Sequence, residues 1–195
     1  MPVRRSPRHV DHEQRRRDII DASRRILVGG GPSALTIRAV AKELGGSITL
    51  VTHFFPTRPE LMRAVVAEMI DSYDTELAAL EEGADAPTRL RILMRWMLPL
   101  AEEDWGAEKG RIVLIAQRDQ EPSIGEFFTT MDARVRGLLR SHVEPLVPAE
   151  QVDATVDLLR VLANGLVLSA VEHHHVWPPE RQLAVLDAAL AAYGL

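Results

Sequence analysis

The sequence predicts an all-α protein in which a small N-terminal unit of three helices precedes a larger helical domain. Three observations support this prediction. Apolar residues recur at three- and four-residue spacing along most of the 195 residues, helix-capping residues and glycines separate these runs, and no run alternates as a half-buried strand would. With 46% hydrophobic residues, the chain is also large enough to bury a substantial core.

The first helix is expected over residues 12–28. Asp11 and Gln14 have the spacing of a capping box, and apolar side chains from Ile19 to Leu27 then share one helical face. The following stretch "GGGPS" ends the helix, because consecutive glycines and a proline disfavour helical backbone.

A second, short helix follows and ends at Gly45. Thr36 is a suitable N-cap, and Leu35 and Val40 have the spacing of a hydrophobic staple. Gly45 provides the left-handed exit from the helix.

The third helix is expected over residues 48–54, after a turn at Gly46 and an N-cap at Ser47. Together with the second helix it forms a helix-turn-helix, and such a unit can place its second helix in the major groove of DNA. The side chains that would face the bases are Ile48, Thr49, Leu50 and Thr52. The alternative is that two core helices simply meet at a glycine turn.

A long fourth helix begins directly after this unit. Thr57 and Glu60 have capping-box spacing, and apolar residues continue at helical spacing from Leu61 to Leu77. Arg58 lies in the first turn, where an arginine beside free backbone N–H groups can hold a phosphate.

In the rest of the chain, the spacing of apolar residues predicts five further helices and no strand. Their expected ranges are 86–103, 106–119, 122–145, 149–173 and 178–193. The predicted organisation is a basic, disordered arm at 1–11, a helix-turn-helix domain at 12–57 and a second domain at 58–195.

Charge and composition narrow the possible partners. Residues 1–66 contain 12 Lys and Arg against 6 Asp and Glu, whereas residues 67–195 contain 11 against 22. A basic N-terminal third favours nucleic acid, because phosphate contact needs local positive charge, although a solvated arginine face has the same composition. The lack of cysteine excludes disulfide scaffolds, thiolate zinc sites and cysteine nucleophiles. We expect no membrane-spanning run and no signal peptide, and hence a cytoplasmic protein.

Residues 15–66 read "RRRDIIDASRRILVGGGPSALTIRAVAKELGGSITLVTHFFPTRPELMRAVV". This run contains an isoleucine-rich first helix, a glycine break, Thr36 followed by "IRAVAKELG", Ser47 before the third helix, Phe55 at its end and a basic residue before Leu61. In this order the features resemble the N-terminal domain of the tetracycline-repressor (TetR) family of transcriptional regulators. The resemblance implies a DNA-binding repressor that is not an enzyme and needs no cofactor.

The resemblance also implies roles for individual residues. Thr36 and Ser47 open the two helices of the DNA-binding unit, and His53 and Arg58 contact the DNA backbone. Arg38 matches a position that reaches a base in some relatives, where an arginine could bind guanine in a bidentate manner. A surface phosphate contact or a solvated arginine is the open alternative for Arg38.

Two positions depart from the family pattern. Thr49 stands where the family commonly has glycine or another small residue. Thr52 stands where it commonly has a tyrosine near the end of the recognition helix, so a frequent phosphate contact is missing. The operator sequence and the affinity are therefore less predictable than the fold.

The run "LLRVLANGLVLSAVEHHHVWPPERQLAVLDAALAAYG", residues 158–194, closely resembles the end of the TetR branch that includes betaine-pathway regulators. This implies a ligand-binding and dimerisation domain whose last two helices, 149–173 and 178–193, pair with their copies in a homodimer. The expected interface residues are Leu158, Leu162, Gly165, Leu166, Ser169, Leu183, Leu186 and Leu190. The alternative is that they pack only within one chain.

The expected partners are a palindromic double-stranded DNA operator and a small-molecule effector of unknown identity. Candidate pocket residues are Met94, Trp96, Met97, Trp105, Ile115, Arg118, Phe127, Phe128 and Met131, with Arg95 and Gln117 as further polar candidates. Simple core packing is the alternative for the apolar ones.

Histidine, serine and acidic side chains are the candidates for a metal site or an enzymatic active site. His173, His174 and His175 are consecutive, so on a helix they point about 100° apart and cannot converge on one ion. We expect a solvent-facing helix end and no metal. The pairs Ser169–His173 and Asp119–Glu121 lack an orienting third group. The main alternative function is a helical small-molecule-binding protein or enzyme with weak or lost DNA specificity.

Overall fold

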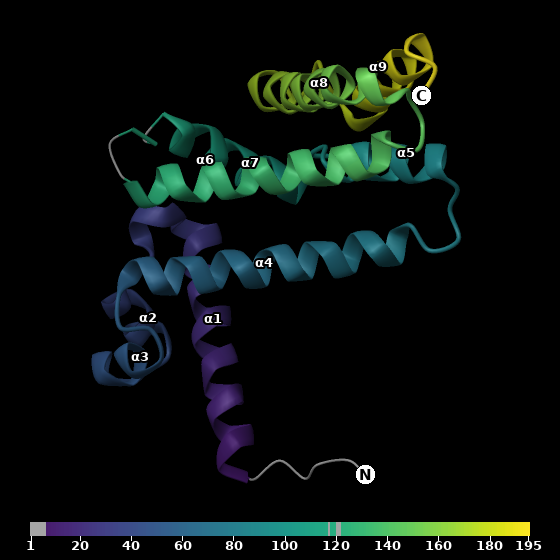
Figure 1. Ribbon diagram of the computed structural model, residues 1–195. Helices are drawn as coiled ribbons and strands as arrows, with labels where there is room; N and C mark the ends of the chain where they lie inside the picture. The colour runs from purple at the N-terminus through teal and green to yellow at the C-terminus, as the bar shows by residue number, and fades with distance from the viewer. Residues whose placement is uncertain (1–6, 117, 120–121) are drawn as a thin grey trace, which may run out of the picture. The chain divides into compact units, whose positions relative to one another are not determined.

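The computed structural model describes residues 7–116, 118–119 and 122–195, and every regular element in these ranges is helical (Figure 1). In chain order the elements are α1 (Pro7–Ala34), α2 (Ile37–Glu43), α3 (Ile48–Phe54), α4 (Arg58–Leu80), α5 (Ala86–Trp96), α6 (Glu102–Ile115), α7 (Pro122–Val143), the 3₁₀ turn η1 (Ala149–Gln151), α8 (Val152–Glu172) and α9 (Pro179–Ala192). The predicted all-α fold is confirmed. The first six residues of the predicted arm lie outside the described residues.

α1 is longer than the sequence predicted at both ends. It begins at Pro7, and its backbone stays helical through the first two glycines of "GGGPS". The break comes at Gly31, whose φ of 73° and ψ of 179° lie outside the helical region and suit only glycine. A short helical segment then continues to Ala34 and leads into the fully buried Leu35.

α5 ends at Trp96, well before the predicted residue 103, because Pro99 follows closely. Proline lacks a backbone N–H and disfavours helical backbone in the residue before it. The next helix, α6, then begins earlier than predicted, with the Asp104 side chain accepting a hydrogen bond from the Ala101 N–H at 3.0 Å. Trp105 therefore lies in the first turn of α6.

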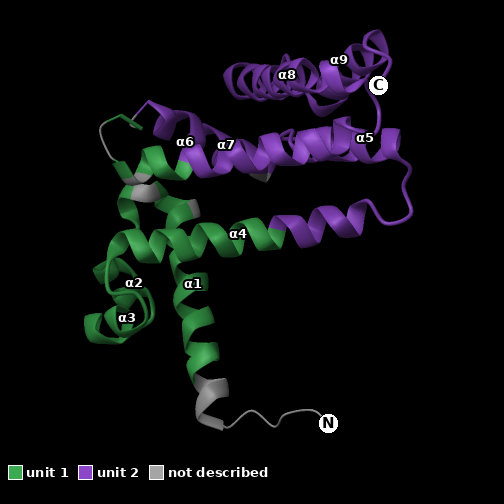
Figure 2. Ribbon diagram, viewed as in Figure 1, with its two compact units in different colours: residues 1–72, 117–127 green, residues 73–116, 128–195 purple. Residues whose placement is uncertain are grey.

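Packing divides the chain into two compact units (Figure 2). The first contains residues 1–72 and 117–127, and the second contains residues 73–116 and 128–195. The divisions fall inside α4 and inside α7, so both of these helices are shared by the two units.

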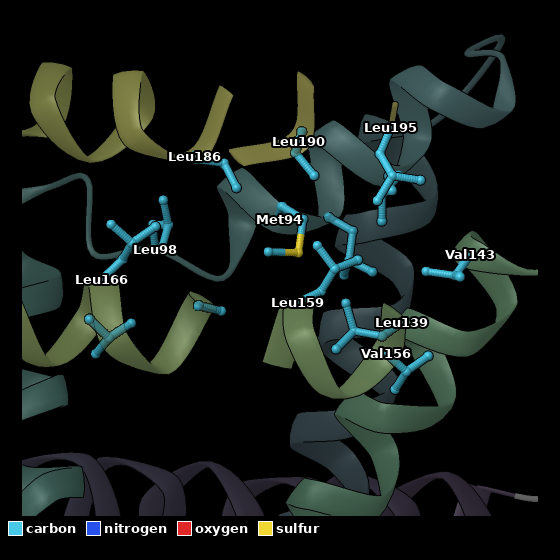
Figure 3. Packing of buried hydrophobic residues seen from close by; sticks show 14 of the residues in the cluster. Met94, Leu98, Leu139, Val143, Val156, Leu159, Leu166, Leu186, Leu190 and Leu195 are labelled. Carbon is cyan, nitrogen blue, oxygen red and sulfur yellow. The ribbon is translucent and has the colours of Figure 1, made fainter. Parts of the chain in front are cut away.

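The second unit has a continuous hydrophobic core (Figure 3). Met94 of α5, Leu139 of α7, Leu159 of α8 and Leu190 of α9 are at most 2% exposed and belong to one cluster of buried side chains. Four helices therefore contribute to the same core, as expected for a helical domain whose elements each bury one apolar face.

Contrary to the expectation from sequence, one stretch among the described residues is long and apolar enough to cross a membrane by length and composition. It is Ala149–Glu172, with 24 residues and a mean hydropathy of 1.5. A core helix of a helical domain meets the same criterion, and α8 contributes Val156, Leu159 and Ala163 to the core. Only 33% of the apolar window is buried within the chain, so much of α8 faces outward.

Candidate nucleic-acid interface

α2 starts and ends as the sequence predicted. The Thr36 Oγ1 accepts a hydrogen bond from the Ala39 backbone N–H at 3.1 Å, which caps the helix. Leu35 and Val40 are both 0% exposed, so the predicted staple lies in the core. Gly45 has a φ of 61°, the left-handed exit that glycine tolerates.

α3 matches its predicted range and is capped by Ser47. The Ser47 Oγ accepts a hydrogen bond from the Leu50 N–H at 3.2 Å. Val51 is 0% exposed and Phe55, the residue after the helix, is 5% exposed. These two residues fix α3 against the rest of the first unit and determine which of its sides faces outward.

The four predicted base-facing residues differ in exposure. Ile48 is 46% exposed and Thr49 is also exposed, whereas Leu50 and Thr52 are half-buried. Leu50 covers the turn, because its Cδ2 lies only 3.0 Å from where a Cβ on Gly46 would be. The Thr52 hydroxyl donates to the Thr49 carbonyl at 3.3 Å, so its oxygen remains available as an acceptor. Ile48 and Thr49 are the most outward of the four.

Arg58 joins two parts of the first unit. The Arg58 Nε donates to the Leu35 carbonyl at 2.8 Å, which links the first turn of α4 to the segment before α2. The Thr57 Oγ1 accepts from the Glu60 N–H at 3.4 Å, as the predicted capping box requires. Arg38 is exposed on α2. The DNA contacts assigned to Arg38 and Arg58 stay predictions.

Sequence reasoning missed a contact between α1 and the end of α3. The His12 ring lies 4.5 Å from the Phe54 ring and 6.1 Å from the His53 ring, between centroids. The Arg16 guanidinium carbon lies 5.4 Å from the Phe55 ring centroid. His12 and Arg16 are four residues apart and therefore share one face of α1, which is the signal in the sequence that could have revealed the contact.

The predicted pocket residues are divided between core and surface. Met94 is fully enclosed in the core of the second unit. The Trp96 Nε1 donates to the Glu76 carboxylate and the Trp105 Nε1 donates to the Pro99 carbonyl, both at 3.2 Å. Met97, Phe127, Phe128 and Met131 are half-buried, Ile115 and Arg118 are exposed, Arg95 pairs with Asp187, and Gln117 lies outside the described residues. The pocket stays a prediction.

The predicted dimer residues also fall into two groups. Leu166, Leu186 and Leu190 are at most 3% exposed and pack in the core of their own chain, as the alternative interpretation of these residues had it. Leu158, Leu162, Ser169 and Leu183 are half-buried, and Gly165 is exposed. The most exposed apolar side chains of α8 are two that the sequence did not single out, Val161 at 70% and Leu168 at 44%.

The three consecutive histidines have different environments. His173 ends α8 and is exposed, as is His175, whereas His174 is half-buried with its ring 4.9 Å from the Trp105 ring. Burial lowers the pKa of His174, and the charges of His175 and Lys109 act in the same direction. Within the part of the chain that the structure describes, no three His, Asp or Glu side chains are grouped to hold a metal ion.

Of the two residue pairs considered for catalysis, the structure describes both members of only one, Ser169 and His173. Ser169 and His173 are joined through the backbone, with the His173 N–H donating to the Ser169 carbonyl at 3.0 Å at the end of α8. Asp119 is exposed, and Glu121 lies outside the described residues.

The geometry of the first unit defines the class of protein. Two short capped helices joined at a glycine turn, with one side of the second in the core and the other outward, form the helix-turn-helix of DNA-binding proteins. Residues 19–65 match the family described as bacterial regulatory proteins of the tetR family, and residues 86–194 match the BetI-type transcriptional repressor C-terminal domain. The chain belongs to the TetR family, with a BetI-type C-terminal domain, and is a transcriptional regulator rather than an enzyme.

Individual relatives agree with this assignment. The chain is 23% identical to the regulator BetI of Rhizobium meliloti over 159 residues, which cover 79% of this chain and 76% of that protein. It is 26% identical to BetI of Escherichia coli K12 over 160 residues, 80% of this chain and 82% of that protein. A 38% identical match to the regulator PksA of Bacillus subtilis spans 56 residues, 29% of this chain and only 27% of PksA.

Solved structures share the fold. A transcriptional regulator from Rhodococcus sp. Rha1 superposes with a TM-score of 0.70 at 24% identity, over 91% of this chain and 94% of its own. A regulator from Saccharomonospora viridis, solved in complex with choline, has a TM-score of 0.68 at 19% identity, over 92% of this chain and 96% of its own.

Proposed function

We propose that the protein is a homodimeric repressor that binds a palindromic operator in double-stranded DNA and leaves it when a small-molecule effector binds the C-terminal domain. The observation that carries this proposal is the capped α2–α3 unit, in which Val51 holds α3 in the core while Ile48 and Thr49 face outward. Short uncharged side chains let a helix approach base edges closely, and threonine can both hydrogen-bond to a base and touch a thymine methyl group. A protein that acts on chromosomal DNA in this way works in the cytoplasm.

The outer face of α8 supports the dimer. Val161, Gly165 and Leu168 are exposed and follow one another at helical spacing, so they form one apolar stripe. A two-fold pairing of α8 with its copy, flanked by α9, would bury this stripe, and Gly165 would let the helices approach closely. Half-buried Leu158 and Leu162 border the stripe and would extend the contact.

A dimer explains why a palindrome is the expected target. Two recognition helices related by a two-fold axis read two half-sites spaced by about one DNA turn, roughly 34 Å. The effector releases DNA only if it binds the wrongly spaced state more tightly than the DNA-binding state. α4 is suited to couple the two events, because it follows the helix-turn-helix directly and both units share it, as they also share α7.

Choline is bound by the S. viridis regulator, whose 19% identity to this chain reflects a common fold. Choline is therefore the first compound to test, in a panel that also contains apolar and aromatic compounds.

The test is a fluorescence-anisotropy titration of the purified protein against tiled duplexes from its own upstream region, with a random duplex as control, at two salt concentrations. We expect tight and selective binding to one palindromic tile and release by at least one compound. Thr49→Ala and Leu50→Ala should change the ranking of operator variants, because these side chains lie on the base-facing helix. Equal affinity for every tile and the random duplex would contradict the proposal.

A further inference from the structure

Two imidazoles lie side by side at the C-terminal end of the recognition helix, outside the residues proposed to read bases. His12 comes from α1 and His53 from the last turn of α3, with 6.1 Å between ring centroids and an angle of 79° between ring planes. We propose that His12 and His53 together form a proton-dependent phosphate-binding site, which tightens DNA binding as the pH falls from about 8 to about 6. This inference rests on the proposed binding of DNA by α3.

The position of His53 on its helix places it on the DNA side. His53 follows Thr49 by four residues, so the two side chains share one face of α3. Both are exposed, whereas Val51 between them is buried. Since a helix that enters the major groove has its far end beside the sugar-phosphate backbone, an outward side chain one turn beyond Thr49 meets phosphate rather than bases.

His12 is held in place by aromatic packing. Its ring lies 4.5 Å from the Phe54 ring at a tilt of 41°, and Arg16, one turn further along α1, packs over Phe55. This face of α1 therefore packs against the aromatic residues at the end of α3. Among the described residues, neither the His12 nor the His53 ring nitrogens have a hydrogen-bond partner, so both imidazoles can bind an external acceptor.

The charges around the pair favour coupling between proton and phosphate. His53 is the only ionisable side chain in α3. Along the sequence of α1, the charged or titratable residues within four positions of His12 are Arg8, His9, Asp11, Glu13, Arg15 and Arg16. Two imidazolium rings about 6 Å apart repel each other, and a phosphate anion beside both rings would offset this repulsion. A DNA phosphate supplies that anion, and binding therefore takes up protons from solution.

The experiment measures DNA affinity by anisotropy at pH 6.0, 7.0 and 8.0, each at several salt concentrations, on the operator tile and on random duplex. For the wild-type protein we expect about tenfold tighter binding at pH 6.0 than at pH 8.0, as one added charge-assisted contact to phosphate would produce. The slope of log affinity against log salt should also be steeper by about 1 at pH 6.0, because more phosphates are neutralised.

Three variants separate charge from packing. His12→Phe keeps the ring contact with Phe54 but cannot take up a proton, so it should bind like the wild type at pH 8.0 and lose most of the gain at pH 6.0. His53→Gln should lose the same gain. His173→Gln replaces an exposed histidine of the second unit and serves as the matched control, which should keep the full pH dependence.

The inference and the proposed function can fail separately. If His12→Phe retains the wild-type pH dependence and salt slopes, the His12–His53 site is wrong whether or not an operator is found. If no tile is preferred over random duplex, operator recognition is wrong, but the proton-dependent gain should still appear on random DNA because phosphate contacts carry no sequence information. Affinity that is independent of pH in the wild type overturns the inference.

Discussion

Arg58 combines a structural contact with a predicted contact to DNA. Its Nε donates to the Leu35 carbonyl at 2.8 Å, so the guanidinium holds the start of α4 near the start of α2. The charge of the same side chain is what the resemblance assigned to the phosphate backbone. With the predicted phosphate contact, this one residue would connect the geometry of the helix-turn-helix with its DNA affinity.

Replacement of Arg58 should separate these two roles. Arg58→Ala should weaken binding to operator and random DNA alike and reduce the salt slope by about 1 per protomer, because one phosphate contact is lost. Arg58→Lys should keep the salt slope but lower the free energy of unfolding by about 1 kcal/mol, because lysine has a methylene where the Arg58 Nε–H donates to the Leu35 carbonyl. Anisotropy and urea unfolding measure the two effects, and an unchanged salt slope in Arg58→Ala would exclude the phosphate contact.

His174 should make the protein sensitive to acid. Burial lowers the pKa of His174 in the folded state below its ordinary value of 6.5, so the unfolded chain binds more protons as the pH falls through that value. Stability is therefore complete above about pH 6.5 and decreases below it, as the pH falls toward the folded-state pKa. His174→Gln should reduce the loss of thermal stability between pH 7.5 and 5.5, whereas exposed His173→Gln should not. Identical losses in both variants and the wild type would refute this.

At the scale of elements, polar contacts attach the C-terminal part of α4 to α5 and α7. Asp74 pairs with Arg134 of α7, and Glu76 accepts a hydrogen bond from Trp96 of α5 at 3.2 Å. Leu77, directly after Glu76, is 3% exposed and belongs to the core of the second unit. This end of α4 is therefore anchored to α5 and α7.

A buried polar cluster completes the attachment directly after α4. The Glu81 carboxylate lies 2.5 Å from the His142 Nε2 of α7 and 2.9 Å from the Arg89 guanidinium of α5. The His142 Nδ1 faces the Leu138 carbonyl at 2.7 Å and therefore carries a hydrogen, so a second proton must lie between His142 and Glu81. Sequence analysis missed this cluster, although a histidine within the apolar stripe of α7 was a visible signal.

Loss of the Glu81 carboxylate should be strongly destabilising. Glu81→Ala leaves His142 buried without its partner, and we expect a decrease of about 3 kcal/mol in the free energy of unfolding. Glu81→Gln should cost less, because an amide can donate to a neutral imidazole while accepting from Arg89. Urea denaturation compares the three proteins. Equal stability of Glu81→Ala and the wild type would show that the cluster contributes nothing.

At the scale of the whole molecule, the proposed regulation needs two copies and two states. The α8 stripe is the surface proposed to join the copies, and its apolar exposure is unusual for a helix that also contributes to a core. Because the helix-turn-helix is small, one copy would make few contacts with DNA. A dimer would gain affinity by holding two helix-turn-helix elements at the spacing of the operator half-sites.

A single negative charge on the apolar stripe of α8 should dissociate the proposed dimer into monomers. Val161→Glu places two carboxylates near the proposed two-fold axis, so light scattering after size-exclusion chromatography should show a monomer, and operator affinity should fall at least tenfold by the loss of bivalency. Val113→Glu on α6 is the matched control, since Val113 is 59% exposed, comparable with Val161 at 70%. A dimeric Val161→Glu protein would place the interface elsewhere.

The sequence by itself determined the helical class, the capped α2 and α3, the left-handed Gly45 and the family. These features depend on residues three or four positions apart, and caps and turns follow from local backbone chemistry. Pro99 also marked the end of α5 in the sequence, although the predicted helix ran past it.

Only the tertiary structure decided which side chains from distant parts of the chain meet. It placed His12 against Phe54, paired Glu81 with His142, and turned Leu166, Leu186 and Leu190 into the core while leaving Val161 outward. Helical spacing defines a face but not the neighbour that covers it, because an apolar stripe satisfies its own core and a partner's surface equally well. That choice follows from the packing of whole helices against one another.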